Sequence, residues 1–257
     1  MDVPSRAVCE IVDAWANLTL QEVTVGIIGA LVVAGLGYLA GVLRSRIRQR
    51  AVRRQSQREL SAFGERMLSA GASNFYSGRD DWARYRRPAD LGAYLRTAQH
   101  SVDIACYWMA QGVLSGIPRV LGDLAEQGLS VRVVTIDPKG PAVNCLTSDL
   151  ELSSADIRKN VRQTIVSLLD VKSQLSQQAK PRFQIGTTQI VPQAAVILLD
   201  CGRDSCVLQL EFRPYRTPRS HSFSLEFRRR DSGVLERSLE ASWTKFFDDS
   251  RPVSEQS

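Results

Sequence analysis

Two short apolar runs set the fold class of this chain: Ser-Val-Asp-Ile-Ala-Cys-Tyr-Trp-Met at residues 101–109, and Leu-Ser-Val-Arg-Val-Val-Thr-Ile-Asp at residues 129–137. Runs of this length, bounded by turn and helix signals, are typical of buried strands. Between them, residues 112–127 carry a helical pattern that contains Pro118 and ends at Gly128. A strand, a helix and a second strand in this order predict an α/β fold.

The same alternation of strands and helices continues to the end of the chain. The expected helices cover residues 88–99, about 153–178 and 232–249, and Ser153 or Ser154 can cap the second of them. The expected strands cover residues 182–190, 194–200, 207–212 and the alternating stretch around Phe223, Leu225 and Phe227. These elements use nearly all of residues 73–250, which predicts one domain followed by a short tail, residues 251–257.

An uncharged stretch of 21 residues, Val23–Leu43, precedes this domain. As a helix it would span roughly 30 Å, the thickness of the hydrocarbon core of a bilayer. A signal peptide is disfavoured because residues 1–22 carry four acidic residues and one Arg. We therefore predict a single transmembrane helix, and a helical linker over residues 44–72 that ends at Gly71.

The charges beside this stretch predict its orientation. Seven arginines follow it closely: Arg44, Arg46, Arg48, Arg50, Arg53, Arg54 and Arg58. Basic residues stay on the cytoplasmic side and attract anionic lipid headgroups. We expect an inner-membrane protein with residues 1–22 outside the cell, the domain in the cytosol and lipid as a partner. Nucleic-acid contact is the alternative for these arginines.

Small residues recur along one face of the predicted membrane helix. They are Gly26, Ala30, Ala34, Gly37 and Gly41, and the last two frame a GxxxG motif. Such a face lets two helices approach closely in lipid, which predicts a homodimer.

The composition excludes several classes of protein. The net charge of +6 comes mostly from residues 1–58, which hold eight Arg and four acidic residues, so the rest is nearly neutral and nucleic acid is not expected as a partner. The five cysteines are irregularly spaced, and no GxGxxG, phosphate-binding P-loop or zinc pattern is present. We therefore predict no cofactor and no metal.

The residues from Ala98 to Ile104 and from Gly128 to Val134 resemble the first strands of phospholipase D-like domains. The resemblance covers roughly residues 88–249 and implies a mixed sheet flanked by helices. In that superfamily a His-x-Lys-x4-Asp signature attacks a phosphodiester through its histidine, while its lysine neutralises the phosphate. At the matching positions this chain has Gln193, Ala195 and Asp200, so only the Asp is kept.

The remaining histidines do not restore the signature. His100 and His221 are the only ones, and neither is followed two residues later by Lys. Phospholipase D chemistry is therefore not expected, and no catalytic residue is assigned. In similar bacterial proteins a degenerate domain of this kind serves as a sensor or regulatory module.

Two charged segments are the other candidates for a binding site. Residues 75–87 are rich in aromatics and could present Arg79 and Arg84 to an anion, or could clasp the sheet. Residues 213–221 could bind an acidic ligand through Arg213, Arg216, Arg219 and His221, or could form a solvated hairpin loop. Gln193 and Asp200 complete the expected ligand site.

The interpretation that these patterns favour is a membrane-anchored, catalytically silent phospholipase D-like domain. It would bind an acidic small ligand or a protein partner and regulate through that binding. Two alternatives stay open: a diverged phosphodiesterase acting on lipid or nucleic acid, for example through His221, and an effector or scaffold whose membrane helix perturbs the bilayer.

Overall fold

The computed structural model describes residues 58–77, 90–109, 113–150, 152–213, 222–229 and 234–253. These residues belong almost entirely to one compact unit, which runs from Leu60 to Ser257. The predicted membrane helix, Val23–Leu43, lies outside the described residues. Within the described part of the chain, no helix combines the length and the apolar character needed to cross a bilayer.

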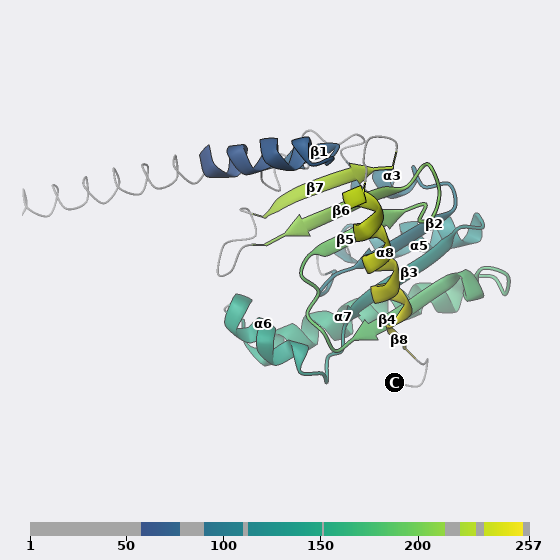
Figure 1. The fold of residues 1–257 in the computed structure, drawn as a ribbon. Helices are drawn as coiled ribbons and strands as arrows, with labels where there is room; N and C mark the ends of the chain where they lie inside the picture. Colours follow the sequence, from purple (N-terminus) through teal and green to yellow (C-terminus); the bar gives the residue numbers. More distant parts are fainter. Residues whose placement is uncertain are drawn as a thin grey trace, which may run out of the picture. The chain divides into compact units, whose positions relative to one another are not determined.

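The unit is built on a mixed sheet of eight strands, ordered β1-β7-β6-β5-β2-β3-β4-β8 (Figure 1). The strands are β1 (Asn74–Tyr76), β2 (Ser101–Ala105), β3 (Ser130–Ile136), β4 (Phe183–Thr188), β5 (Ala195–Leu199), β6 (Val207–Phe212), β7 (Phe223–Arg228) and β8 (Arg251–Pro252). The three strands β2, β3 and β4 are parallel, while every other neighbouring pair is antiparallel. The predicted α/β class is therefore confirmed, with a mixed sheet.

Helices cover both faces of this sheet. On one face α3 (Leu91–Leu95), α5 (Ile117–Glu126) and α7 (Ser154–Gln174) bury a core with β2 and β3. The helix α8 (Val234–Asp248) packs on the other face, as Figure 1 shows, together with Met67 from a helix that ends at Ser69. A third cluster joins α6 (Ala142–Leu150) and the start of α7 to the end of β3. A 3-10 turn, η1 (Lys180–Arg182), leads into β4.

Local chemistry accounts for where several elements begin and end. The Ser153 side chain accepts a hydrogen bond from the Asp156 N–H, so it is the predicted cap of the long helix α7. Pro118 lies in the first turn of α5, where its missing N–H costs nothing. Gly128, with φ of 101°, turns the chain from α5 into β3 in a conformation that favours glycine.

Two predicted helices are shorter than the sequence patterns indicate. Within the described residues, the expected helix 88–99 is observed as α3, and the N–H groups of Gln99 and His100 bond to Asp200 instead of continuing the helix. The expected helix 112–127 is interrupted: Val113 and Leu114 are helical, and α5 begins at Ile117 because Gly116 adopts a left-handed conformation between the two parts. The helix α6 and the short strands β1 and β8 have no counterpart in the expected elements.

Candidate functional site

Gln193 and Asp200 lie at opposite ends of one strand. β5 separates them, and its five residues span about 16 Å. Gln193 is exposed whereas Asp200 is 2% exposed. The two residues expected in one ligand site therefore lie at opposite ends of β5. We refer below to the Gln193 end and the Asp200 end of the sheet.

Asp200 is a structural connector. Its carboxylate accepts hydrogen bonds from the backbone N–H groups of Gln99 at 2.9 Å and His100 at 2.7 Å, from Ser101 at 3.2 Å, and from the Ser205 hydroxyl at 3.1 Å. With φ of 52°, it is the one described non-glycine residue in the left-handed region. These contacts join the β5–β6 turn to the start of β2. The carboxylate therefore already accepts hydrogen bonds from within the chain. The side chain of His100 is exposed.

The Gln193 end gathers residues from five strands. Because β5 and β7 run opposite to β1, β2 and β6, the starts of the first two meet the ends of the last three. The residues just outside those strands are Ser77, Tyr107, Gln193, Arg213 and Ser222. This end of the sheet is therefore where the described flanks of the two charged segments converge.

Tyr107 contributes a phenol to this end of the sheet. Burial raises its pKa, the nearby carboxylate of Asp149 raises it further, and Arg213 acts in the opposite direction. Its ring packs beside that of Trp108, with centroids 6.1 Å apart. At neutral pH Tyr107 therefore keeps its proton and can act as a hydrogen-bond donor.

A polar surface runs from the middle of the sheet to the Gln193 end. The apolar residues of β6 and β7 point toward α8, so the residues between them point to the opposite face. We call this opposite surface the polar sheet face; its members are Asn74, Tyr76, Gln209, Glu211, Ser222, Ser224 and Glu226. Tyr76, Ser224, Glu211 and Ala195 are successive register partners across four strands. Ala195 therefore lies beside the acidic side chain of Glu211.

One member of the polar sheet face is fully partnered. The Glu226 carboxylate accepts hydrogen bonds from the Asn74 amide at 2.9 Å, from the Arg228 guanidinium at 2.9 Å and from the Tyr94 hydroxyl at 3.4 Å. Glu226 is 1% exposed, and these three donors compensate its burial.

Two other members are buried without a partner. Gln209 Oε1 and Ser222 Oγ accept and donate no hydrogen bond, although each residue is only 2% exposed. Buried polar atoms in native proteins are nearly always paired, and an unpaired one costs about 1–3 kcal/mol. The polar sheet face therefore offers unused hydrogen-bonding capacity at two places: at Gln209 in the middle of the sheet, and at Ser222 near the Gln193 end.

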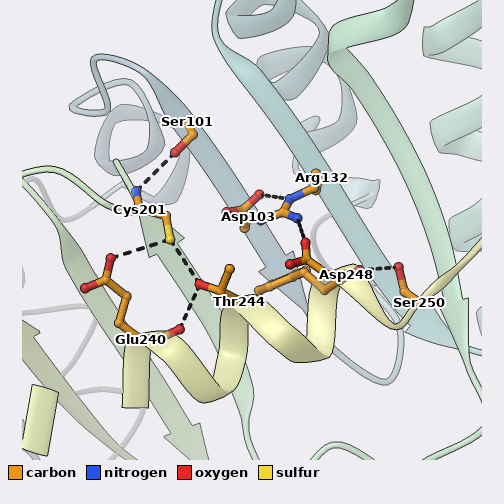
Figure 2. Close-up of polar contacts among 9 residues, drawn as sticks. Ser101, Asp103, Arg132, Cys201, Glu240, Thr244, Asp248 and Ser250 are labelled. Atoms are coloured by element: carbon orange, nitrogen blue, oxygen red, sulfur yellow. Dashed lines mark hydrogen bonds and ion pairs between the residues drawn. The ribbon is translucent and has the colours of Figure 1, made fainter. Parts of the chain in front are cut away.

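The opposite face holds a buried ion pair beneath α8. Figure 2 shows the Arg132 guanidinium between Asp103, at 2.7 Å, and Asp248, also at 2.7 Å. Burial raises the pKa of Asp103, and the hydrogen bond from Arg132 lowers it by a smaller amount. The guanidinium also lies 5.2 Å from the centre of the Phe247 ring. This arrangement fixes the C-terminal half of α8 to β2 and β3.

The first half of α8 carries the side chains best suited to hold a metal. Cys201 Sγ lies 3.5 Å from Glu240 Oε1 and 3.2 Å from the Thr244 hydroxyl (Figure 2). Cys206, Glu236 and Glu240 form a buried group of potential ligands next to them. This group was not expected from the sequence; the available signal was the pair of glutamates four residues apart on an expected helix, together with two nearby cysteines.

A pocket of about 370 Å³ opens at the other edge of the sheet. It is lined by residues of β3, β4 and the α8–β8 connection, among them Gln184, Phe247 and Pro252. None of the residues predicted for the ligand site lines it.

Most of the remaining predicted site residues cannot be placed. Arg58 is helical and exposed, and Arg213 directly follows β6. The others lie outside the described residues: Arg79, Arg84, Arg216, Arg219 and His221, the small residues of the predicted dimer face, and the six arginines from Arg44 to Arg54.

Comparison with known proteins assigns neither a family nor a function to this chain. No protein-family model and no curated protein matches this chain. A solved structure of TrmBL2, an archaeal chromatin protein with a novel mode of DNA binding, aligns with a TM-score of 0.38 and 8% identity. The alignment covers 84% of this chain and 68% of that one. A likeness this weak carries no argument about family or function.

Proposed function

We propose that this chain is a membrane-anchored, catalytically silent phospholipase D-like domain that senses a ligand or partner at the Gln193 end of its sheet. The order α3, β2, α5, β3 agrees with the order on which the resemblance rests. Within the unit, the parts needed for phosphodiester chemistry are missing: Gln193 and Ala195 replace the nucleophile and its lysine, and Asp200 is committed to backbone N–H groups.

The observation that carries a binding role is the unpartnered hydroxyl of Ser222 at the Gln193 end of the polar sheet face. This hydroxyl can donate as well as accept, and the Oε1 atom of Gln209, also unpartnered, can accept a hydrogen bond nearer the middle of the sheet. Ser222 follows the charged segment that ends at His221, and Arg213 precedes that segment. An acidic ligand at this end would meet a guanidinium and the hydroxyls of Ser222 and Tyr107.

Thermal unfolding of the purified full-length chain, with inorganic phosphate as the probe, tests the binding role. We expect phosphate to raise the Tm of the wild type in proportion to the logarithm of its concentration. Arg213→Ala and Ser222→Ala should remove most of that rise. Arg182→Ala is the matched control, because Arg182 is exposed and precedes β4 at the Asp200 end. An equal rise in all four proteins would indicate a general salt effect and reject the proposal.

Hydrolysis of bis(p-nitrophenyl) phosphate tests the claim of catalytic silence. The expected result is no turnover above that of the buffer. Turnover that disappears in His221→Ala would instead support the diverged phosphodiesterase.

The membrane anchor and the pairing of chains rest on Val23–Leu43. We expect the full chain to remain with the membrane after alkaline extraction, and Leu31→Arg combined with Val32→Arg to release it. Crosslinking in membranes should give dimers that Gly37→Ile and Gly41→Ile abolish. An unchanged dimer yield would remove this helix from the dimer interface.

A further inference from the structure

The inward face of α8 places two carboxylates against a thiol. Glu236 and Glu240 are four residues apart and so project from the same side of the helix. The Sγ atom of Cys206 and one carboxylate oxygen from each glutamate all lie within 4.8 Å of one another. All three residues are buried.

Glu240 is held in position by its neighbours. Its Oε1 accepts a hydrogen bond of 2.6 Å from the Gly202 N–H, and the Cys201 thiol lies 3.5 Å from the same oxygen. Cys201 also contacts the Thr244 hydroxyl, one turn further along α8. The β5–β6 turn therefore presents both of its cysteines to the carboxylates of α8.

Glu236 is the unexplained member of the group. Its residue is 0% exposed, and neither carboxylate oxygen has a hydrogen-bond partner. Within the described residues it makes no ion pair. An ionised carboxylate buried without a partner is very costly, and a second carboxylate beside it adds repulsion. A cation between them would remove both costs.

We propose that Cys206, Glu236 and Glu240 bind one divalent transition-metal ion of the zinc class. Magnesium and calcium prefer oxygen ligands throughout, whereas zinc accepts thiolate and carboxylate together. On binding, the metal forms bonds to Sγ and to the two carboxylates, and the protons of the Cys206 thiol and of any protonated carboxyl pass to solvent. Cys201 lies where a fourth donor can approach.

The position of the site indicates a structural role for the ion. The site joins the turn between β5 and β6 to the first half of α8, and it lies on the face of the sheet opposite the polar sheet face. The ion would clamp α8 onto the sheet. The inference does not depend on the proposed ligand-sensing function.

Cobalt titration of the full-length chain, purified with its thiols reduced and stripped of metal, tests the site. We expect one equivalent of Co²⁺ to bind and to produce a sulfur-to-cobalt charge-transfer band. Cys206→Ser should abolish the band, and Glu236→Gln should weaken binding at least tenfold. Cys145→Ser is the matched control, since Cys145 is an exposed cysteine on α6, and it should bind as the wild type does.

Thermal unfolding with zinc gives a second readout, which remains useful if Cys206→Ser fails to fold. Zinc should raise the Tm of the wild type and of Cys145→Ser but not that of Glu236→Gln. Without metal, Glu236→Gln should melt at or above the temperature of the wild type, because it removes a buried ionisable carboxyl group beside Glu240. Absence of the charge-transfer band in the wild type, or an equal zinc response in Glu236→Gln, would overturn the proposal.

Discussion

The carboxylate of Asp200 accepts a hydrogen bond of 2.7 Å from the backbone N–H of His100, which lies one hundred residues earlier in the chain. Together with the hydrogen bonds from Gln99 and Ser101, this contact holds the residues between α3 and β2 against the β5–β6 turn. Asp200 therefore serves to join two parts of the fold.

Replacing Asp200 should destabilise the domain strongly. Asp200→Ala leaves the partly buried N–H groups of Gln99 and His100 without an acceptor and puts alanine in a left-handed conformation, so we expect a loss of about 2 kcal/mol or more. Asp200→Asn keeps an acceptor and tolerates that conformation, so it should lose less. Urea unfolding measures both. A loss below about 1 kcal/mol in the alanine variant would contradict the role assigned to this residue.

The ion pair beneath α8 should be costly to break and inexpensive to replace. Arg132→Met leaves Asp103 buried without its partner, and we expect a loss of about 3–5 kcal/mol. The double variant Asp103→Leu with Arg132→Met should recover most of this loss because no buried charge remains. Asp248→Asn is the control: that side chain is 61% exposed, so its loss should stay below about 1 kcal/mol. A double variant as unstable as Arg132→Met would disagree with this account.

The stability of the metal-free protein should fall as the pH rises above the ordinary pKa of a glutamate, 4.5. Burial, and then the charge of Glu240, raise the pKa of Glu236 in the folded protein. In this interval the unfolded chain has released the proton and the folded one retains it. The folded state therefore binds more protons, and raising the pH favours unfolding, by at most about 1.4 kcal/mol per pH unit.

Urea unfolding in EDTA between pH 5 and pH 8 measures this slope. Glu236→Gln should flatten the slope and raise the stability at the upper end of the range. Glu65→Gln, at an exposed helical position, should leave the slope unchanged. The same slope in wild type and Glu236→Gln would show that another group titrates.

The contact between α5 and α7 requires a glycine at position 122. A Cβ at Gly122 would lie 2.6 Å from Val171 Cγ1. Alanine is favoured over glycine by about 1 kcal/mol inside a helix, but overpacking costs about 1–3 kcal/mol, so Gly122→Ala should be neutral to destabilising. Adding Val171→Ala makes room and should restore part of the loss. A Gly122→Ala variant more stable than the wild type by chemical denaturation would show that the helices separate without penalty.

Much of the architecture follows from short-range pattern. The runs at residues 101–109 and 129–137 are apolar enough to be recognised as buried strands, and they form β2 and β3. Ser153 caps α7 as its position before an amphipathic stretch predicts. In contrast, β1 and β8 are only three and two residues long, and they exist because β7 and β4 offer edges to pair with.

The chemistry of the unit depended on contacts between distant residues. Gln193 and Asp200 are seven positions apart in a pattern that suggests one site, but an extended strand separates their side chains. Glu236 and Glu240 look like exposed charges of a surface helix, and only the docking of α8 turns them toward Cys206. The periodicity of apolar residues along the chain predicts the secondary structure of a segment, because secondary structure depends largely on neighbouring residues. Which polar atoms become buried, paired or orphaned depends on what the fold brings against them.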